Sequence, residues 1–443
     1  MNFELGLKRA IIGKEGRNKD RNLWVTLIDL TTRIASFLRK NAKYDEIKEV
    51  PKEPRYFYEH GEFGEYPIFA FSSPRCGMYE AGFCTPCGYS NIAGTGGISK
   101  KRLYNAQISQ AQYILDNFDR FITSKQSGIL NKHNIYRRFK NALCYKLQIA
   151  GNSSFFRDME ITRENRWKIL HLFDNYAKEK QINLHIMLET RPEHLIQVYE
   201  TGELDEIEKR GLLKNLNIVV NMGFESVNEF SRNVIYSKNM KLSDIKKSVI
   251  IAKNYGLDPS LFLFLGFHSM VEREIIEDAR KSLGYLKILN VPPSLMIPNI
   301  QKYTVNDLLY KYGRYNLIDP RTILEIVKLC LDFKLTRDNP SLKVDWFFGG
   351  LEAEPSPYLS VFNNKKNITC EKCSGIIHKY FLQLKCDYDI DYFLKKIRII
   401  ERCKCKNDYE KRLDCKAIPL IDRVSSNLVF ADLRKQDYIN SLL

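Results

Sequence analysis

Cys76-Gly77-Met78-Tyr79-Glu80-Ala81-Gly82-Phe83-Cys84-Thr85-Pro86-Cys87-Gly88-Tyr89 follows the short apolar run Tyr66-Pro67-Ile68-Phe69-Ala70-Phe71. The apolar run predicts a buried strand, and the glycines and the proline after it predict a loop that turns sharply. The cysteines of the loop have the spacing C-x7-C-x2-C. Close thiols on a turning loop indicate that the loop surrounds a compact inorganic group.

An iron–sulfur cluster suits these cysteines, because thiolates are its usual ligands. A 4Fe–4S cluster held by Cys76, Cys84 and Cys87 would have one iron without a protein ligand. S-adenosylmethionine can chelate such an iron through its amino and carboxylate groups before it is cleaved reductively to a radical. Zinc with a distant fourth ligand is the alternative, since a C-x2-C pair suits zinc equally well. The spacing by itself does not separate the two.

The composition indicates an intracellular protein with a polyanionic partner. The chain has 69 Lys and Arg against 53 Asp and Glu, a net charge of +16, although a Lys-rich genome could produce the same balance. No run of 18 apolar residues and no signal-peptide pattern occurs, so we expect a soluble, cytoplasmic protein. Nine of the 11 cysteines fall within residues 76–87 and 370–415, which in a reducing compartment favours metal sites over disulfides.

The second cysteine group predicts a metal module. Cys370 and Cys373 form one close pair, and Cys403 and Cys405 form another. Two pairs suit a structural zinc ion with four thiolates, and a second iron–sulfur cluster is the alternative.

Strands and helices alternate between these two groups. The expected strands are 66–71, 145–150, 183–188, 217–222, 260–265 and 293–297. A long helix is expected over 100–121, and further helices are expected over 161–178, 242–254 and 272–288. One more helix is expected to begin within 194–199. Such alternation predicts parallel strands with crossover helices. The fold class is therefore α/β, a partial (β/α)6 barrel with a small C-terminal Cys-rich module.

The chain divides into four expected parts. Residues 1–60 form a basic N-terminal extension with a helix over 24–39, and residues 61–310 form the barrel. Residues 311–360 form a helical connector, and residues 361–443 form the Cys-rich module.

Polar residues follow the expected strands, where barrels of this kind carry their active sites. The candidates are Gly151, Asn152, Ser153, Glu189, Arg191, Glu225 and Gln301. The turn at Gly151 could accept the cofactor's ammonium or be an ordinary strand-to-helix turn. Arg191 could hold a carboxylate or form a structural ion pair with Glu189. Glu225 is a candidate catalytic carboxylate, and the alternative is an acid at a helix N-terminus.

The order of these motifs resembles the radical S-adenosylmethionine superfamily, in the branch that includes the elongator catalytic subunit, and most closely the archaeosine synthase radical family, RaSEA. The matching stretches are Cys76–Tyr89, Ser153-Ser154-Phe155, Glu189-Thr190-Arg191-Pro192-Glu193, Gly223-Phe224-Glu225-Ser226, Gln301-Lys302-Tyr303-Thr304 and Cys370-Glu371-Lys372-Cys373. Within the superfamily C-x3-C-x2-C is commoner than the spacing found here. Pro86 replaces a frequent aromatic residue, and Ser153 stands where the family has glycine.

The resemblance implies a radical enzyme that acts on a modified nucleoside of tRNA. Its reaction would cleave a carbon–nitrogen bond of a lysine-adducted deazaguanine to give archaeosine. The implied cofactors are a 4Fe–4S cluster and S-adenosylmethionine. The implied partners are tRNA, an ArcS-like archaeosine synthase subunit that transfers the lysine, and an electron donor. The alternatives are a radical enzyme with a peptide or small-molecule substrate, and a non-catalytic zinc protein that binds RNA.

Overall fold

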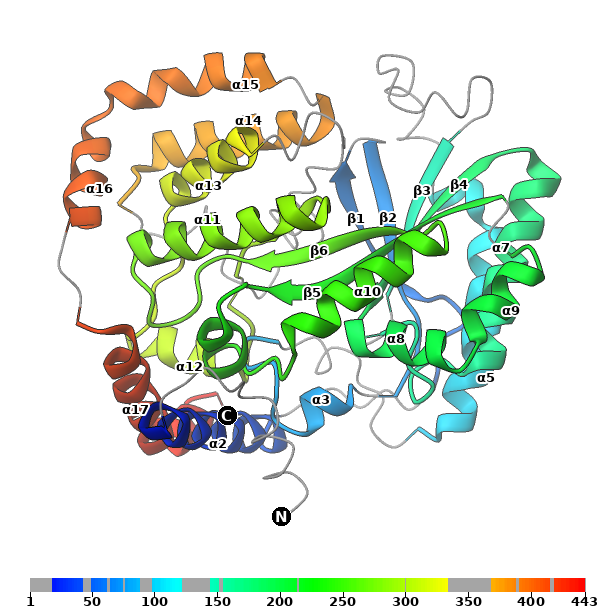
Figure 1. Ribbon diagram of the computed structural model, residues 1–443, viewed down its shortest axis with the longest axis horizontal. Helices are drawn as coiled ribbons and strands as arrows, with labels where there is room; N and C mark the ends of the chain where they lie inside the picture. The colour runs from blue at the N-terminus through cyan, green and yellow to red at the C-terminus, as the bar shows by residue number, and fades with distance from the viewer. Residues whose placement is uncertain are drawn as a thin grey trace.

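The fold is that of a computed structural model, which describes residues 18–42, 49–61, 64–74, 76–87, 98–121, 144–150, 154–212, 215–298, 300–333, 368–387, 390–414 and 418–442. Its centre is a seven-stranded sheet in the order β1-β2-β3-β4-β5-β6-β7 (Figure 1). The strands are β1 (Arg55–Gly61), β2 (Gly64–Ala70), β3 (Cys144–Ala150), β4 (Asn183–Thr190), β5 (Leu216–Glu225), β6 (Asp258–Phe264) and β7 (Pro293–Met296).

The six strands β2 to β7 are parallel, as the alternating sequence pattern predicts. Among the described strands β7 pairs with β6 alone, so the sheet is open and the barrel is partial. Strand β1 was not expected from the sequence; it pairs antiparallel with β2, from Arg55 opposite Ala70 to Gly61 opposite Gly64. The α/β fold class and the partial barrel are therefore confirmed.

The helices that connect and cover the parallel strands are α3 (Gly77–Glu80), α5 (Lys100–Asp116), α7 (Arg163–Lys180), α8 (Pro192–Glu200), α9 (Glu203–Lys209), the π-helix η2 (Phe230–Ile235), α10 (Leu242–Asn254), α11 (Glu272–Leu289) and α12 (Val305–Lys311). Local signals set their ends. Thr162 caps α7 by accepting a hydrogen bond from the backbone N–H of Asn165, and Gly256, with φ +67°, follows α10.

The flanking helices are α2 (Asn18–Lys40), α13 (Pro320–Asp332), α14 (Glu371–Asp387), α15 (Ile390–Ile397), the 3₁₀-helix η4 (Arg398–Arg402), α16 (Lys404–Asp414) and α17 (Leu420–Asn440). Helices α2 and α17 come from opposite ends of the chain and lie side by side (Figure 1). Their buried apolar residues belong to the same core cluster as buried apolar residues of the strands. No helix among the described residues has both the length and the apolar character needed to cross a membrane.

Candidate active site and metal centre

The cysteine loop, residues 76–87, lies after the carboxyl end of β2. Cys76 is the residue before α3, and Cys84 adopts a left-handed backbone conformation with φ 56°. Cys76 and Cys84 are buried, Cys87 is half-buried, and none of the three is joined in a disulfide. The structure therefore gathers the predicted cysteine ligands on one short, folded loop.

A segment far along the chain holds this loop by its backbone. The N–H of Cys84 donates to the carbonyl of Ser237 at 2.9 Å, and the N–H of Thr85 donates to the carbonyl of Tyr236 at 3.0 Å. The hydroxyl of Thr85 donates to the carbonyl of Ile235 at 3.1 Å. The end of η2 thus forms one wall of the loop.

Helix α2 forms another wall, and Gly82 makes the close approach possible. Gly82 has φ +83°, and a Cβ atom there would lie 2.4 Å from Oγ of Ser36 and 2.5 Å from the carbonyl oxygen of Thr32. Real Cβ atoms do not approach backbone oxygens this closely, so α2 would have to move. Glycine is required here for its conformation and for its lack of a side chain.

Replacing Gly82 by Ala is expected to weaken both the fold and the cysteine loop. A left-handed alanine costs about 1–2 kcal/mol, and the clash with α2 adds to that cost. Gly256→Ala is the matched control, because Gly256 has φ +67° with nothing within 4 Å of its Cβ position. Denaturant unfolding of the two variants should show the larger loss for Gly82→Ala; equal losses would contradict the close approach.

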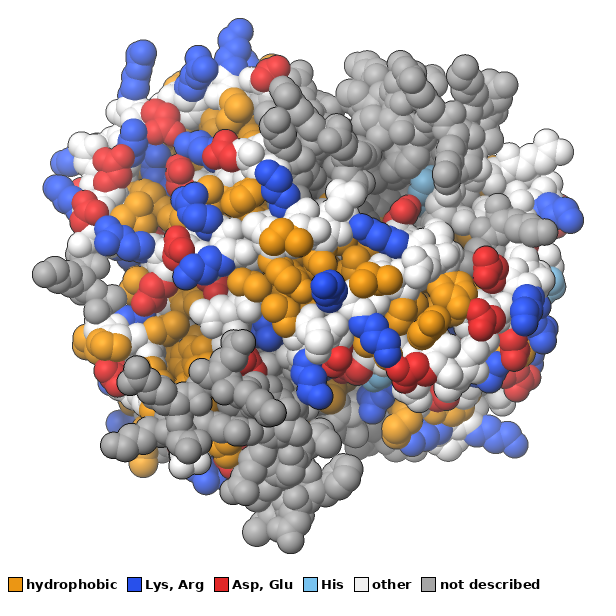
Figure 2. Space-filling view, in the orientation of Figure 1, with side chains coloured by type: hydrophobic (Ala, Val, Ile, Leu, Met, Phe, Trp, Pro, Cys, Tyr) orange, Lys and Arg blue, Asp and Glu red, His pale blue; other side chains and the backbone are white. Residues whose placement is uncertain are grey.

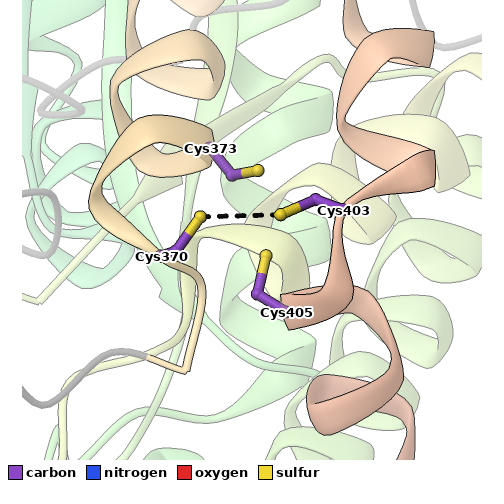
Figure 3. Close-up of side chains that lie close together, drawn as sticks. All are labelled: Cys370, Cys373, Cys403 and Cys405. Carbon is purple, nitrogen blue, oxygen red and sulfur yellow. Dashed lines mark hydrogen bonds between the residues drawn. The ribbon is translucent and has the colours of Figure 1, made fainter.

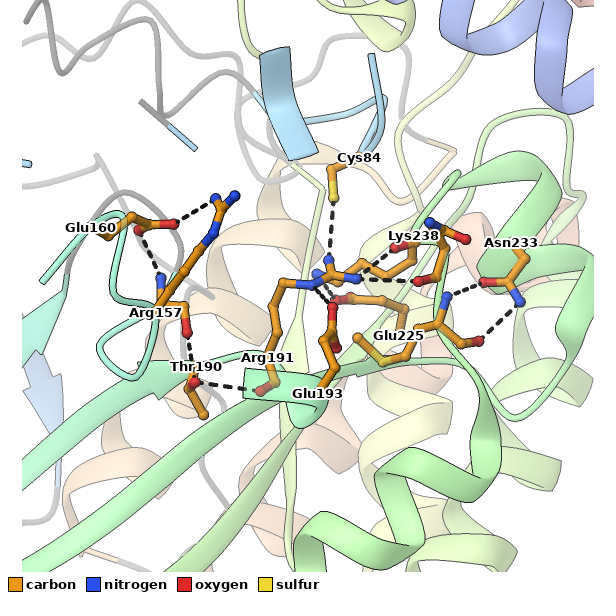
Figure 4. A network of polar contacts seen from close by, with 12 residues as sticks. Cys84, Arg157, Glu160, Thr190, Arg191, Glu193, Glu225, Asn233 and Lys238 are labelled. Carbon is orange, nitrogen blue, oxygen red and sulfur yellow. Dashed lines mark hydrogen bonds and ion pairs between the residues drawn. The ribbon is translucent and has the colours of Figure 1, made fainter. Parts of the chain in front are cut away.

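Arg191 points at the cysteine loop from the end of β4 (Figure 4). Its Nη1 lies 4.0 Å from Sγ of Cys84, and its Nη2 donates to the carbonyl of Lys238 at 2.9 Å. Its Nε forms an ion pair with the carboxylate of Glu193, whereas the sequence offered Glu189 as one possible ion-pair partner. Burial lowers the pKa of Arg191, but Glu193 and the Cys84 sulfur raise it more, so its guanidinium stays charged beside the thiol.

Glu225 forms a buried ion pair with Lys238, Oε1 to Nζ 2.7 Å. The register of β5 shifts between Gly223 and Glu225, and this bulge gives Glu225 a φ of 64°. A Cβ at Gly223 would lie 2.8 Å from Cε of Lys238, so glycine leaves the room for the pair. Burial lowers the pKa of Lys238, yet Glu225 and Cys84 raise it overall, which keeps the ammonium charged.

Left-handed residues other than glycine cluster at this site. Cys84, Glu225, Ser237 and Asn239 all have φ between 55° and 64°. Such conformations are unfavourable and persist where surrounding contacts impose them, commonly at functional sites. Lys238 lies between two of these residues. The sequence interpretation missed it, and its position in a short link between η2 and α10 gave no periodic signal.

The other predicted residues of the strand ends are placed as follows. Glu189 accepts a hydrogen bond from Nε2 of Gln148 at 2.6 Å. Gln301 is buried after β7, and its carbonyl accepts a hydrogen bond from Thr304. Gly151, Asn152 and Ser153 lie outside the described residues. The structure brings Arg191, Glu225 and the cysteine loop together around Lys238.

One buried layer of the barrel interior carries polar groups with unused hydrogen-bonding capacity. Asn221 pairs in register with Glu189 on β4 and with Ser260 on β6, so the three lie at one level. Neither the side-chain nitrogen nor the side-chain oxygen of Asn221 has a hydrogen-bond partner among the described residues. The hydroxyl of Ser260 also has none there. Buried polar groups are normally satisfied, so this layer is suited to a polar ligand or to water.

The four C-terminal cysteines converge on one point (Figure 3). The sulfur atoms of Cys370, Cys373, Cys403 and Cys405 all lie within 4.8 Å of one another. The distance from Sγ of Cys370 to Sγ of Cys403 is 3.7 Å. A tetrahedral zinc site with zinc–sulfur distances of about 2.3 Å has sulfur–sulfur edges of about 3.8 Å. The geometry therefore fits a single tetrahedral ion.

The surroundings of this group suit a set of negatively charged ligands. Nη2 of the buried Arg321 donates to Sγ of Cys405 at 3.3 Å and to the carbonyl of Ile400 at 2.8 Å. The carboxylate of Asp319 accepts from the N–H groups of Ile368 and Thr369, next to Cys370. The start of α13 is thus bonded to residues next to the four cysteines.

The loop cysteines are arranged differently. Within the described residues, the C-terminal group is the one set of three or more metal-binding side chains with all ligand atoms within 4.8 Å of one another. Cys76, Cys84 and Cys87 do not form such a group. A four-iron cluster binds each thiolate to a different iron, so its cysteine ligands do not have to meet at one point as the ligands of a single zinc ion do.

Comparison with known proteins places this site in context. No protein-family model matches the chain. An uncharacterized protein of Methanocaldococcus jannaschii is 24% identical over 309 residues, which is 67% of this chain and 74% of that protein. Archaeosine synthase subunit beta of Methanosarcina acetivorans is 24% identical over 258 residues, 58% of this chain and 64% of that protein. The same subunit of Thermococcus kodakarensis is 25% identical over 171 residues, 39% of this chain and half of that protein.

Solved structures of radical enzymes are also similar. The match to methylornithine synthase covers 93% of this chain and 96% of the chain of that enzyme, with a TM-score of 0.34 and 11% identity. Coproporphyrinogen III oxidase of Escherichia coli, a radical SAM enzyme, covers 68% of this chain and 55% of its own, with a TM-score of 0.33 and 16% identity. TM-scores this low carry no assignment by themselves. The sequence relatives confirm the predicted resemblance to archaeosine synthase subunit beta.

Proposed function

We propose that the protein is a radical S-adenosylmethionine enzyme whose Cys76, Cys84 and Cys87 hold a 4Fe–4S cluster. The observation that carries the proposal is the folded cysteine loop at the carboxyl ends of six parallel strands, with Arg191 4.0 Å from the sulfur of Cys84. A buried cation beside a thiol favours the thiolate, which is the form that binds iron. When bound, the cluster and S-adenosylmethionine supply the 5′-deoxyadenosyl radical.

The residues around the loop can orient an amino-acid cofactor. The buried pair of Glu225 and Lys238 offers an anion and a cation 2.7 Å apart, which matches the ammonium and carboxylate of S-adenosylmethionine. Arg191 adds positive charge, but its guanidinium nitrogens are already bonded to Glu193 and to the backbone carbonyls of Lys238 and Asn239. We therefore assign Glu225 to the ammonium and Lys238, supported by Arg191, to the carboxylate. Gly151, Asn152, Ser153, Glu189 and Gln301 remain proposed cofactor contacts.

The proposed substrate is a lysine-adducted deazaguanine in tRNA, cleaved at a carbon–nitrogen bond to give archaeosine. The support is the similarity to proteins named archaeosine synthase subunit beta, together with a net charge of +16. The alignments cover 64% and 50% of the lengths of those two relatives. The proposed activity is therefore inferred from relatives that match this chain over part of their length. The proposed partners are tRNA, an ArcS-like lysine-transferring subunit and an electron donor.

The positive charge is dispersed. Figure 2 shows Lys and Arg side chains interspersed with Asp and Glu on the face that it presents. An RNA that contacts such a surface would be held at several separate points. Folded RNA is recognised mainly through its shape and backbone, which suits dispersed contacts.

Binding of tRNA is expected to weaken steeply as salt concentration rises, because Lys and Arg contacts to phosphates release counterions. Titration of labelled tRNA at two salt concentrations measures this effect. In the same preparation, reconstituted protein given S-adenosylmethionine, a reductant and lysine-adducted tRNA should release 5′-deoxyadenosine, whereas unmodified tRNA should bind without turnover.

The outcomes separate the alternatives. Release of 5′-deoxyadenosine together with salt-independent or absent tRNA binding would leave the radical chemistry and remove tRNA as the substrate. Salt-dependent binding by a colourless protein that incorporates no iron would contradict the radical function and favour a zinc protein that binds RNA. For the C-terminal group we propose zinc, since the four sulfur atoms have the spacing of a tetrahedral ion.

A further inference from the structure

Arg39, near the end of α2, reaches into the cysteine loop. Its side chain is buried, and Nη1 donates to the carbonyls of Tyr79 at 2.5 Å and Phe83 at 2.8 Å. Nη2 donates to the carbonyls of Cys84 at 2.8 Å and Cys87 at 3.5 Å. The guanidinium carbon also lies 3.8 Å from the ring centroid of Tyr79. One side chain thus holds the backbone of two proposed cluster ligands.

A guanidinium is suited to this task. The loop turns back on itself after α3, and its carbonyls point inward, where each needs a donor. Arginine presents five N–H donors in a rigid planar fork and stacks on aromatic rings, whereas lysine offers one compact ammonium. No other side chain could serve four carbonyls and a ring face from one position. Arg39 therefore helps to fix the position of the backbone of Cys84 relative to that of Cys87.

Helix α2 is itself held in place. Trp24 packs on Phe230 of η2 with ring centroids 5.3 Å apart, and Leu27, Ile34 and Leu38 are buried in the main core. The same η2 leads into residues 236 and 237, whose carbonyls accept hydrogen bonds from the N–H groups of the loop. The cysteine loop is consequently held both by Arg39 of α2 and by the end of η2, and α2 packs against η2.

We propose that Arg39 is a positioning residue of the cluster site, and that the N-terminal helix is part of the metal-binding machinery. The inference rests on the proposed function of Cys76, Cys84 and Cys87. It adds a role that the sequence interpretation did not give to this region, which was expected to be a basic extension. Arg39 fixes the backbone of Cys84 and Cys87, and its positive charge lies behind their carbonyls.

The test compares three full-length variants after anaerobic reconstitution. Arg39→Gln removes the fork and the charge, and Arg39→Lys keeps the charge without the fork. Arg33→Gln is the matched control on the same helix, because Arg33 is exposed and bonded to Asp432 of α17 at 3.3 Å. The measurements are iron per chain, the electron paramagnetic resonance spectrum of the reduced cluster, and its midpoint potential.

Arg39→Gln should lose most of the cluster iron, and the cluster that remains should have an altered spectrum and a more negative potential. The cation of Arg39 stabilises the reduced, more negative form of the cluster. Its removal therefore lowers the midpoint potential. Arg39→Lys should lose iron but keep a potential closer to that of the unsubstituted protein, and Arg33→Gln should match the unsubstituted protein in every measurement. Zinc content and the melting temperature report whether each variant is folded.

If Arg39→Gln folds poorly, Arg39→Ala with added guanidinium at a non-denaturing concentration decides the matter, and recovery of iron binding supports the inference. Full iron content, spectrum and potential in folded Arg39→Gln would overturn the inference and leave the proposed function intact. An unsubstituted protein that takes up no iron would overturn both. The two failures are therefore distinguishable.

Discussion

Replacing Cys84 by Ala is expected to abolish both the iron–sulfur absorbance and the cleavage of S-adenosylmethionine. Cys84 is buried, with its sulfur 4.0 Å from Nη1 of Arg191; its N–H donates to the carbonyl of Ser237, and its carbonyl accepts from Arg39. Two remaining thiolates would not retain a cluster that leaves one iron open for the cofactor. The measurements are iron content after anaerobic reconstitution and 5′-deoxyadenosine by chromatography.

Cys330→Ala is the matched control for this experiment. Cys330 is a fully buried free thiol in α13 that belongs to neither cysteine group, and burial raises its pKa. Its loss should leave iron uptake and 5′-deoxyadenosine formation unchanged. A Cys84→Ala protein with full iron content and undiminished cleavage would show that the loop is not the cluster site.

Replacing Cys373 by Ser should remove the zinc and lower the thermal stability of the protein strongly. Structural zinc sites in small domains contribute about 10–16 kcal/mol of apparent binding free energy. Cys373 is buried within the four-sulfur group, so its loss leaves an incomplete shell that serine does not replace. Elemental analysis and thermal denaturation measure the two effects, and full zinc content in this variant would refute the assignment.

A point substitution is a cleaner test here than a deletion of the module. Helix α17 lies beyond the cysteines and packs on α2, and Tyr438 of α17 donates its hydroxyl to Asp307 and accepts from the N–H of Tyr303. A deletion would uncover α2 and disturb the cysteine loop as well. With Cys373→Ser, any loss of cluster iron can be compared directly with the loss of zinc.

The sequence by itself determined the order of the elements and indicated the four C-terminal cysteines that converge in the structure. Alternating apolar runs predicted the six parallel strands, and Thr162 and Gly256 marked helix ends within about two residues. The close cysteine pairs predicted the four-sulfur group. These signals are local, because a cap or a turn acts within three or four residues.

The tertiary structure decided which distant residues meet at the site. Arg39 contacts a loop 40 or more residues away, and Arg191 reaches Cys84 across 107 residues. Lys238 meets Glu225 because a bulge in β5 turns the carboxylate toward it. Arg39 follows Ala35 by one helical turn on the buried face of α2, which was the one sequence signal for its burial. The partners of such side chains depend on how whole helices pack, which spacing along the chain does not determine.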